Sequence, residues 1–199
     1  MSTDTIVNQR GEVIIADPPF ARTLFSSTRF AWLWLIVRLY VGYDWLSAGW
    51  GKLSGGTWAG GGALKGFWTK AVAPDSSPIA VGWYRGFIQY MLDHGWYTFF
   101  APLVMWGELL VGVALILGAL TGIAAFFGAF MNWNYIMAGT ASTNAWLGIL
   151  TIFLILAWKV AGWYGPDRWL LPLLGTPWQP GEIVARADPP PERQHQADT

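Results

Sequence analysis

Three ionisable residues lie inside long apolar segments of this sequence, where a charge is costly. Arg38 and Asp44 share one segment, and Glu108 lies in another, between Leu103-Val-Met-Trp-Gly107 and Leu109-Leu-Val-Gly-Val-Ala-Leu-Ile-Leu117. On insertion scales, a charged side chain at the centre of a bilayer costs about 2.5 to 3.5 kcal/mol. Such residues therefore mainly face a bundle interior, pair with one another or contact a substrate. We expect a membrane protein with a polar site at its centre.

Arg38 and Glu108 are the two residues with the clearest chemical use. Each lies nine residues into its apolar segment, about 13 Å at 1.5 Å per residue, so both are predicted near the middle of a hydrocarbon core about 30 Å thick. This depth predicts an Arg38–Glu108 ion pair. The pair either only fixes the register of two helices or lines a cavity. In the second case the cation stabilises charge on a quinone carbonyl and the carboxylate delivers protons.

One face of the first segment gathers polar and small residues. Arg38, Gly42, Trp45, Gly49 and Lys52 follow a 4-3-4-3 spacing, which places them on one stripe of a helix. Glycines on such a stripe let a neighbouring helix or a flat ligand approach closely. We therefore assign Gly42 and Trp45 to a cofactor-binding surface. Lys52 is either an interfacial lysine or a cation that attracts an anionic substrate.

A second group of polar residues lies in a later apolar segment. Asn132 shares a helix face with Tyr135 and with the small residues Ala125, Gly128 and Ala129, so we expect it to point inward. We assign Asn132 to catalysis, as an N–H donor, and Asn134 and Tyr135 to the mouth of a cofactor site. Asn134 has the alternative role of satisfying backbone groups near the end of the segment.

Two further residues complete the candidate list. Arg85, in the long connection after the first segment, is expected to attract an anionic substrate together with Lys52. Asp44 lies off the Arg38 stripe and faces a different neighbour. A bond from a nearby hydroxyl or indole N–H explains Asp44 as well as a functional role does.

Four segments are apolar and long enough to be transmembrane helices, which need about 20 residues. They cover about 29–51, 99–117, 122–138 and 145–163, and short turns join the last three. We therefore expect an all-α fold, an integral membrane four-helix bundle in the cell membrane. Arg and Lys are slightly enriched beside the segment ends on the side of the termini, which favours cytoplasmic N- and C-termini. The cations are Arg22, Arg29, Lys159 and Arg168.

The remaining parts of the chain are predicted to be peripheral. Residues 1–28 form a cytoplasmic or interfacial arm, and residues 29–174 form the membrane domain. The connection between the first two segments opens with a glycine-rich flexible linker. Its stretches 63–73 and 78–94 read as amphipathic helices in the outer interface. Prolines after the fourth segment break regular structure, and residues 175–199 are expected to be disordered.

Composition limits the chemistry that the chain can perform. The net charge is zero, which excludes the basic surface that a nucleic-acid partner requires. The absence of cysteine excludes thiol–disulfide chemistry, thiolate-ligated iron–sulfur clusters and covalent haem attachment by this chain. The two isolated histidines, His94 and His195, do not make a metal site, and no flavin motif is present. Electrons must therefore come directly from a substrate or from a partner.

Several of these residues recur in a pattern that resembles the DoxX/DoxD family of small four-helix membrane proteins. The pattern comprises Arg38-x3-Gly42-x6-Gly49-x2-Lys52, Trp83-Tyr84-Arg85-Gly86-Phe87, Gly107-Glu108-Leu109-x2-Gly112, Met131-Asn132-x-Asn134-Tyr135 and Gly165-Pro-Asp167-Arg168. It is most similar to the DoxD-like branch, the large subunit of thiosulfate:quinone oxidoreductase. That resemblance implies oxidation of thiosulfate to tetrathionate, electron transfer to a membrane quinone, and a separate small partner subunit.

Two classes of function are consistent with the residues. In the first, the chain is the membrane subunit of a quinone-linked oxidoreductase with Arg38, Glu108 and Asn132 at the reacting centre. In the second, it is a non-catalytic adaptor that docks a redox or transport complex through its loop helices. A solute carrier is a weaker third interpretation, because no inverted repeat is visible. The expected partners are the bilayer, a small subunit or other membrane redox proteins, and further copies of the chain.

Overall fold

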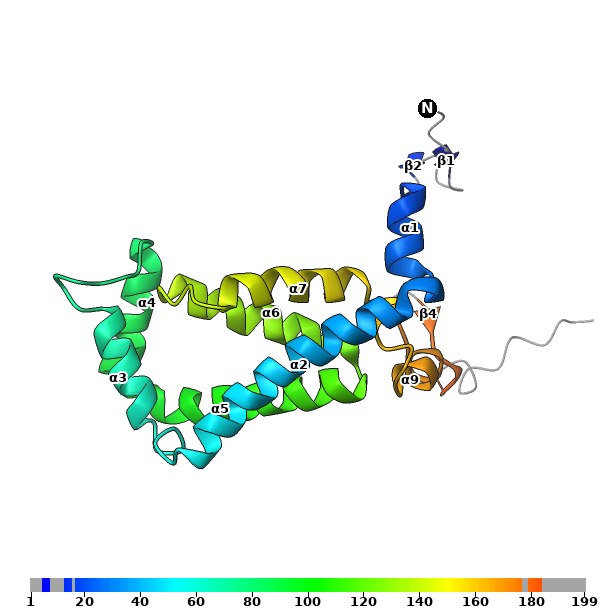
Figure 1. Ribbon diagram of the computed structural model, residues 1–199. Coiled ribbons are helices and arrows are strands. Elements are labelled where there is room, and N and C mark those ends of the chain that lie inside the picture. The colour runs from blue at the N-terminus through cyan, green and yellow to red at the C-terminus, as the bar shows by residue number, and fades with distance from the viewer. Residues whose placement is uncertain (1–4, 8–12, 16, 177–178, 184–199) are drawn as a thin grey trace, which may run out of the picture.

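Four long helices make up the main body of the described part of the protein. The computed structural model describes residues 5–7, 13–15, 17–176 and 179–183. The four helices are α2 (Ala31–Ser54), α5 (Tyr97–Leu117), α6 (Thr121–Met137) and α7 (Asn144–Leu156). They run side by side, and both α2 and α6 pack against α5 and α7 (Figure 1). The fold is therefore helical, as predicted, and each long helix overlaps one predicted apolar segment.

Shorter helices lie at the two ends of this body (Figure 1). At one end, here called the loop end, lie α3 (Gly62–Ala71) and α4 (Gly82–Asp93). At the other end, the terminal end, lie α1 (Pro19–Ser26), the 3-10 helix η1 (Thr28–Phe30), α8 (Trp158–Ala161) and α9 (Asp167–Leu174). The helices of the loop end correspond to the two predicted interfacial helices. Those of the terminal end were not predicted as separate elements.

Two very short β-ribbons accompany the helices. β1 (Thr5–Val7) pairs antiparallel with β2 (Val13–Ile15), and β3 (Gly175–Thr176) pairs with β4 (Gln179–Pro180). The predicted N-terminal arm thus contains β1, β2 and α1. The predicted disordered tail begins with the second ribbon, and its residues 184–199 lie outside the described residues.

Some helix boundaries differ from those predicted. The fourth apolar segment is interrupted at Ala157, whose φ of −89° and ψ of 11° end α7 and start α8. α4 begins at Gly82 rather than at Pro78, because the stretch before it packs in another way: the Ile79 N–H donates to Ser77 Oγ at 3.3 Å, and Ile79 is buried. Pro172, expected to break regular structure, lies inside α9.

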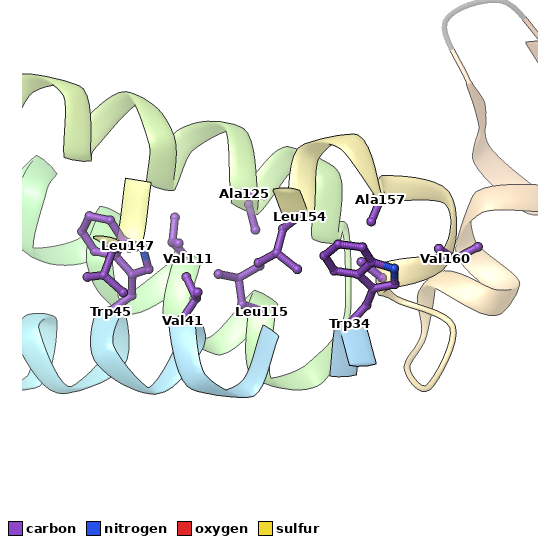
Figure 2. Close-up of a cluster of buried hydrophobic side chains, with 12 residues drawn as sticks. Trp34, Val41, Trp45, Val111, Leu115, Ala125, Leu147, Leu154, Ala157 and Val160 are labelled. Carbon is purple, nitrogen blue, oxygen red and sulfur yellow. The ribbon is translucent and has the colours of Figure 1, made fainter. Parts of the chain in front are cut away.

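An apolar core runs along the inside of the four long helices. Its members come from α2, α5, α6, α7 and α8, and large side chains follow one another along the helix axes from Trp45 to Trp34 (Figure 2). Leu115 and Leu154 are fully buried near the middle of this row. The core explains why these segments pack as helices: each contributes one stripe of buried residues at helical spacing.

The outward faces of the same helices are also apolar, which is unusual for a protein surface in water. Soluble monomers rarely expose contiguous apolar patches larger than a few hundred Å². Large exposed apolar side chains here include Ile36, Tyr43, Trp106, Leu110, Leu117, Ile123, Phe126, Phe127, Phe130, Ile149, Ile152 and Leu156. Among the described residues, α5 alone is both long and apolar enough to cross a membrane, and α7 is a shorter apolar helix. The chain has the character of a helical membrane protein.

Glycines set how α2 and α5 pack. A Cβ added at Gly49 would lie 2.8 Å from the Leu109 amide nitrogen, and one at Gly112 would lie 2.7 Å from the Leu46 Cα. A Cβ at Gly42 would meet the Ile116 side chain at 3.0 Å. The two helices therefore approach closely along about two turns, as small residues at membrane helix interfaces allow. This antiparallel register decides which polar residues face each other.

The loop end has a core of its own. Tyr84, Ile88 and Met91 of α4 are buried against Leu64, Trp68 and Ala71 of α3, together with Ala101 of α5 and Ala138 after α6. This second cluster fixes α3 and α4 across the end of the long helices. The amphipathic character predicted for the two stretches is thereby confirmed.

Candidate functional site

Glu108 is held by two partners at the loop end. The Lys52 Nζ donates to Glu108 Oε2 at 2.6 Å, and the Tyr135 hydroxyl donates to Glu108 Oε1 at 2.5 Å. Glu108 is 1% exposed and the Lys52 side chain is 18% exposed. The three side chains come from α5, α2 and α6, so one hydrogen-bonded chain links three helices. A buried carboxylate stabilised in this way agrees with the rule that buried charges are paired.

Two aromatic rings lie beside the Lys52 ammonium group. The Lys52 Nζ lies 4.8 Å from the centroid of the Trp58 ring and 5.9 Å from that of Tyr135. Cations are attracted to aromatic faces at such distances. Lys52 is therefore neither a lysine that only reaches for the interface nor a free surface cation.

Glu108, Lys52 and Tyr135 line a cavity of about 490 Å³. Binding pockets for small molecules typically measure about 300 to 1,000 Å³. Its aromatic wall comes from Trp45, Trp58 and Phe67, and its remaining polar wall comes from Asp44, Ser47, Thr140, Thr143 and Asn144. The cavity thus combines flat apolar surfaces with a few charged groups in one place.

The predicted Arg38–Glu108 ion pair is wrong, because Glu108 pairs with Lys52. The prediction measured depth from the end of each apolar segment and assumed that the two ends are level. The glycine contacts set a different register, in which α5 extends past the end of α2 and packs against α3. Glu108 therefore lies beside the last turns of α2. Arg38 lies 14 residues before Lys52, about 21 Å along the helix.

Arg38 lies at the terminal end, enclosed by backbone. It is 1% exposed, and its Nη2 donates to the Tyr164 carbonyl at 3.4 Å. Gly118 and Gly165 border the guanidinium so closely that a Cβ at either would contact Nη1. Asp167 attracts Arg38 electrostatically. Arg38 therefore belongs to the packing of the terminal end and does not line the cavity.

Asp167 closes the turn between α5 and α6. Its carboxylate accepts the Leu120 N–H at 2.5 Å and the Thr121 N–H at 2.8 Å, and its own N–H donates to the Gly118 carbonyl at 3.0 Å. Carboxylates at a helix N-terminus satisfy free amides and the helix dipole. The sequence showed this residue only as part of the Gly165-Pro-Asp167-Arg168 pattern, with no role.

Asn132 and Trp45 point inward, as predicted, but their polar side-chain atoms have no hydrogen-bond partner among the described residues. Asn132 is 1% exposed and Trp45 is 3% exposed. Neither the Asn132 amide oxygen and nitrogen nor the Trp45 Nε1 makes a hydrogen bond within the described part of the chain. Buried polar groups are hydrogen-bonded in more than nine cases of ten, so these atoms need an explanation.

The other predicted site residues lie away from the cavity. Gly42 packs against α5, where it serves helix contact. The Asn134 Nδ2 donates to the Phe130 carbonyl at 2.8 Å, and Asn134 Oδ1 accepts from Tyr84, which ties α4 to α6. Burial raises the pKa of the Tyr84 hydroxyl, so it remains a donor. Asn134 thus contacts a backbone carbonyl inside its own helix, and both interpretations of this residue stay predictions.

Arg85 also has a structural partner. Its Nη2 donates to the Val72 carbonyl at 3.0 Å and to the Ala73 carbonyl at 3.3 Å, at the C-terminal end of α3. It lines a second cavity, between α3 and α4, and is absent from the wall of the first. The structure therefore separates Arg85 from Lys52, with which sequence analysis grouped it.

Part of the cavity wall was not predicted from the sequence. Trp58 lies in the segment interpreted as a flexible linker, and Phe67 lies in α3. The signal that could have identified Trp58 is a large aromatic residue within a glycine-rich stretch close to Lys52. Asp44, left open between two interpretations, lines the cavity and makes no hydrogen bond or ion pair with any described residue.

No group of three or more acidic or histidine side chains in the described residues could hold a metal ion.

Comparison with known proteins gives one result that bears on the site. A protein-family model described as DoxX matches residues 33–161. No curated protein and no solved structure matches the chain significantly. The matched range includes the four long helices almost entirely, as well as Glu108, Lys52 and Tyr135.

Proposed function

The chain belongs to the DoxX family, and from this membership and the geometry of the cavity we propose that it is the membrane subunit of a quinone-linked oxidoreductase. The observation that carries the proposal is the hydrogen-bonded chain of Lys52, Glu108 and Tyr135 in the wall of the cavity. A quinone, when bound, supplies an acceptor for two electrons and two protons. In this proposal Lys52, Glu108 and Tyr135 bind the quinone and transfer protons to it.

We place four membrane crossings at α2, α5, α6 and α7, with both termini in the cytoplasm. The many exposed apolar side chains on the outward faces of these helices support the crossings, and the cations near the terminal end support the orientation. Because the chain has no cysteine, single introduced cysteines report topology cleanly. We expect Gly60→Cys, where added atoms meet open space, to be labelled only from outside the cell. The exposed Asp17→Cys should be labelled only from the cytoplasm. The reverse pattern would contradict the orientation.

The residues of the cavity fit a quinone head group. Trp45, Trp58 and Phe67 provide aromatic surface for a flat ring. The Lys52 ammonium has three N–H donors and uses one on Glu108, so others remain for a carbonyl oxygen. Beside the Lys52 ammonium, the Tyr135 hydroxyl donates its hydrogen to Glu108. Charged donors in a site with little water stabilise negative charge on an oxygen atom more strongly than they do in water.

The charges of the cavity also favour a neutral ligand over an anion. Its charged wall residues are two carboxylates, Asp44 and Glu108, and one ammonium, Lys52, which is already paired. A dianion such as thiosulfate would meet net negative charge there. If the donor is thiosulfate, as in the DoxD-like branch, we assign its two-electron oxidation to tetrathionate to a surface outside the cavity or to a partner subunit.

Quinone binding by the purified protein tests this proposal. Mass spectrometry of lipid extracts should detect co-purified quinone, and a short-chain quinone should bind saturably. Tyr135→Phe should weaken binding by up to about tenfold, because Glu108 loses the hydrogen bond, worth about 1.4 kcal/mol, that holds it in the cavity wall. The matched control is Tyr43→Phe, an exposed tyrosine on the outside of α2, which should bind like the wild type. Equal affinity in both variants, or no saturable binding, would favour the alternative adaptor function.

A further inference from the structure

Three buried polar atoms on the inner faces of α2 and α6 make no hydrogen bond within the described part of the chain. They are the Nδ2 and Oδ1 atoms of Asn132 and the Nε1 of Trp45. Both side chains are more than nine-tenths buried. Burying polar atoms without hydrogen bonds costs free energy. Native proteins usually pair such atoms with a bound water or ligand.

Their positions on the helices bring these atoms to the same region. The Trp45 Nε1 lies against the inner face of α6 at Gly128, where a Cβ would approach it to 3.1 Å. Asn132 is four residues further along the same face, about 6 Å on. Helical side chains lean towards the N-terminus of their helix, so the Asn132 amide leans towards Gly128 and the indole. Trp45 also lines the cavity, so its side chain borders both that space and α6.

The three atoms define the chemistry that would satisfy them. The indole Nε1–H and the amide Nδ2–H are donors, and the amide Oδ1 is an acceptor. A carbonyl oxygen accepts from the two donors but leaves Oδ1 unpaired. A hydroxyl oxygen accepts from N–H groups and donates its own hydrogen to Oδ1. Water and the hydroxyl of a phenol or quinol share this chemistry.

We propose that Asn132 and Trp45 bind a hydroxyl oxygen between α2 and α6, inside the helix bundle. The oxygen comes either from a buried water molecule or from the hydroxyl group of a reduced, phenolic ligand. The proposal goes beyond the proposed function and does not rest on it, because it concerns the occupancy of a buried site rather than electron transfer. In either case, substituting Asn132 or Trp45 with an apolar residue removes hydrogen bonds to the bound oxygen.

Thermal unfolding distinguishes an occupied site from an empty one by the sign of the effect. Asn132→Leu keeps the number and branching of the side-chain heavy atoms and removes their polarity. In an empty site it removes unpaired groups and should raise the melting temperature. In an occupied site it should lower the melting temperature by several degrees, at about 2 to 4 °C for each hydrogen bond of ordinary strength. We expect the decrease.

A pair of tryptophans on α2 provides the matched control and covers the case in which Asn132→Leu does not fold. Trp34 and Trp45 are equally buried, and the Trp34 Nε1 donates to the Leu24 carbonyl at 2.8 Å. Trp34→Phe therefore loses a known hydrogen bond. We expect Trp45→Phe to lower the melting temperature by as much. A clearly smaller decrease, or a higher melting temperature for Asn132→Leu, would overturn the proposal.

Ligand addition identifies the source of the oxygen. A soluble hydroquinone and its dimethyl ether are added to the wild type and to Asn132→Leu. If the hydroquinone alone raises the melting temperature, and only in the wild type, the site takes a ligand hydroxyl. If neither compound has an effect while both substitutions destabilise, the site holds water. These experiments do not measure activity, so a failed oxidoreductase assay leaves their outcome unaffected.

Discussion

Gly118→Ala is expected to lower the melting temperature of the protein by about 5 to 20 °C. Gly118 ends α5 with a φ of 76°, and an added Cβ would overlap the Arg38 guanidinium. A left-handed conformation costs an alanine about 1 to 2 kcal/mol, and overpacking costs about 1 to 3 kcal/mol. At about 2 to 4 °C per kcal/mol for a chain of this length, the two effects give the expected range. Unfolding in detergent, followed by circular dichroism, measures it.

Two companion variants separate the causes. Gly148→Ala is the matched control, because Gly148 lies inside α7 and a Cβ there meets nothing within 4 Å. Alanine is the better helix former, so this variant should be as stable as the wild type or more stable by about 0.5 to 1 kcal/mol. Adding Arg38→Ala to Gly118→Ala should relieve the overlap but keep the backbone strain. If Gly118→Ala alone melts with the wild type, Arg38 does not lie where the structure places it.

The helices and their inward faces were predictable from local sequence. Apolar length identified the four long segments, and helical spacing placed Arg38, Trp45, Glu108 and Asn132 inside. Both features depend only on residues within one helix, where a period of 3.6 residues fixes which side chains share a face. The same reasoning found α3 and α4, whose apolar stripes pack against each other.

The partner of Glu108 was not predictable in this way. It depends on how far α5 slides past α2, and that offset is set by contacts at Gly42, Gly49 and Gly112. Exchanging Arg38 for Lys52 as the partner takes an offset of 14 residues, about 21 Å or four helical turns. Lys52 and Arg38 stand on the same stripe, so composition gave no basis for choosing between them. The close approach of α2 and α5 at these glycines sets the offset that brings Lys52 to Glu108.

The roles of Asp167 and Trp58 depend on long-range folding as well. Asp167 lies 46 residues from the Thr121 amide that it caps, and no local pattern connects them. Trp58 reaches Lys52 because the glycine-rich stretch turns back at Gly56 and Gly61, which have φ values of 70° and 81°. The turn glycines were visible in the sequence, but the direction of the turn was not.

Glu108→Ala is expected to destabilise the protein by about 3 to 5 kcal/mol, because it leaves the largely buried Lys52 ammonium and the Tyr135 hydroxyl without their acceptor. Lys52→Met should cost a similar amount by leaving the carboxylate uncompensated. The double variant Lys52→Met with Glu108→Leu should recover most of that loss, since apolar pairs often replace buried ion pairs without cost. Free energies of unfolding in detergent give the coupling between the two positions.

The matched comparison is Arg38→Met with Glu108→Leu, which removes the same two charge types from residues that are not paired. Residues more than about 10 Å apart usually behave additively, so this double variant should be as destabilised as the sum of its single changes. Only the Lys52 pair should therefore show a coupling, of about 3 kcal/mol or more, because each single change is costly and the double variant recovers most of the loss. Its stable double variant should still fail to bind quinone, because the donors of the cavity are gone. Equal coupling in both pairs, or none in either, would remove the Lys52–Glu108 contact from the site and with it the basis for proton handling in the cavity.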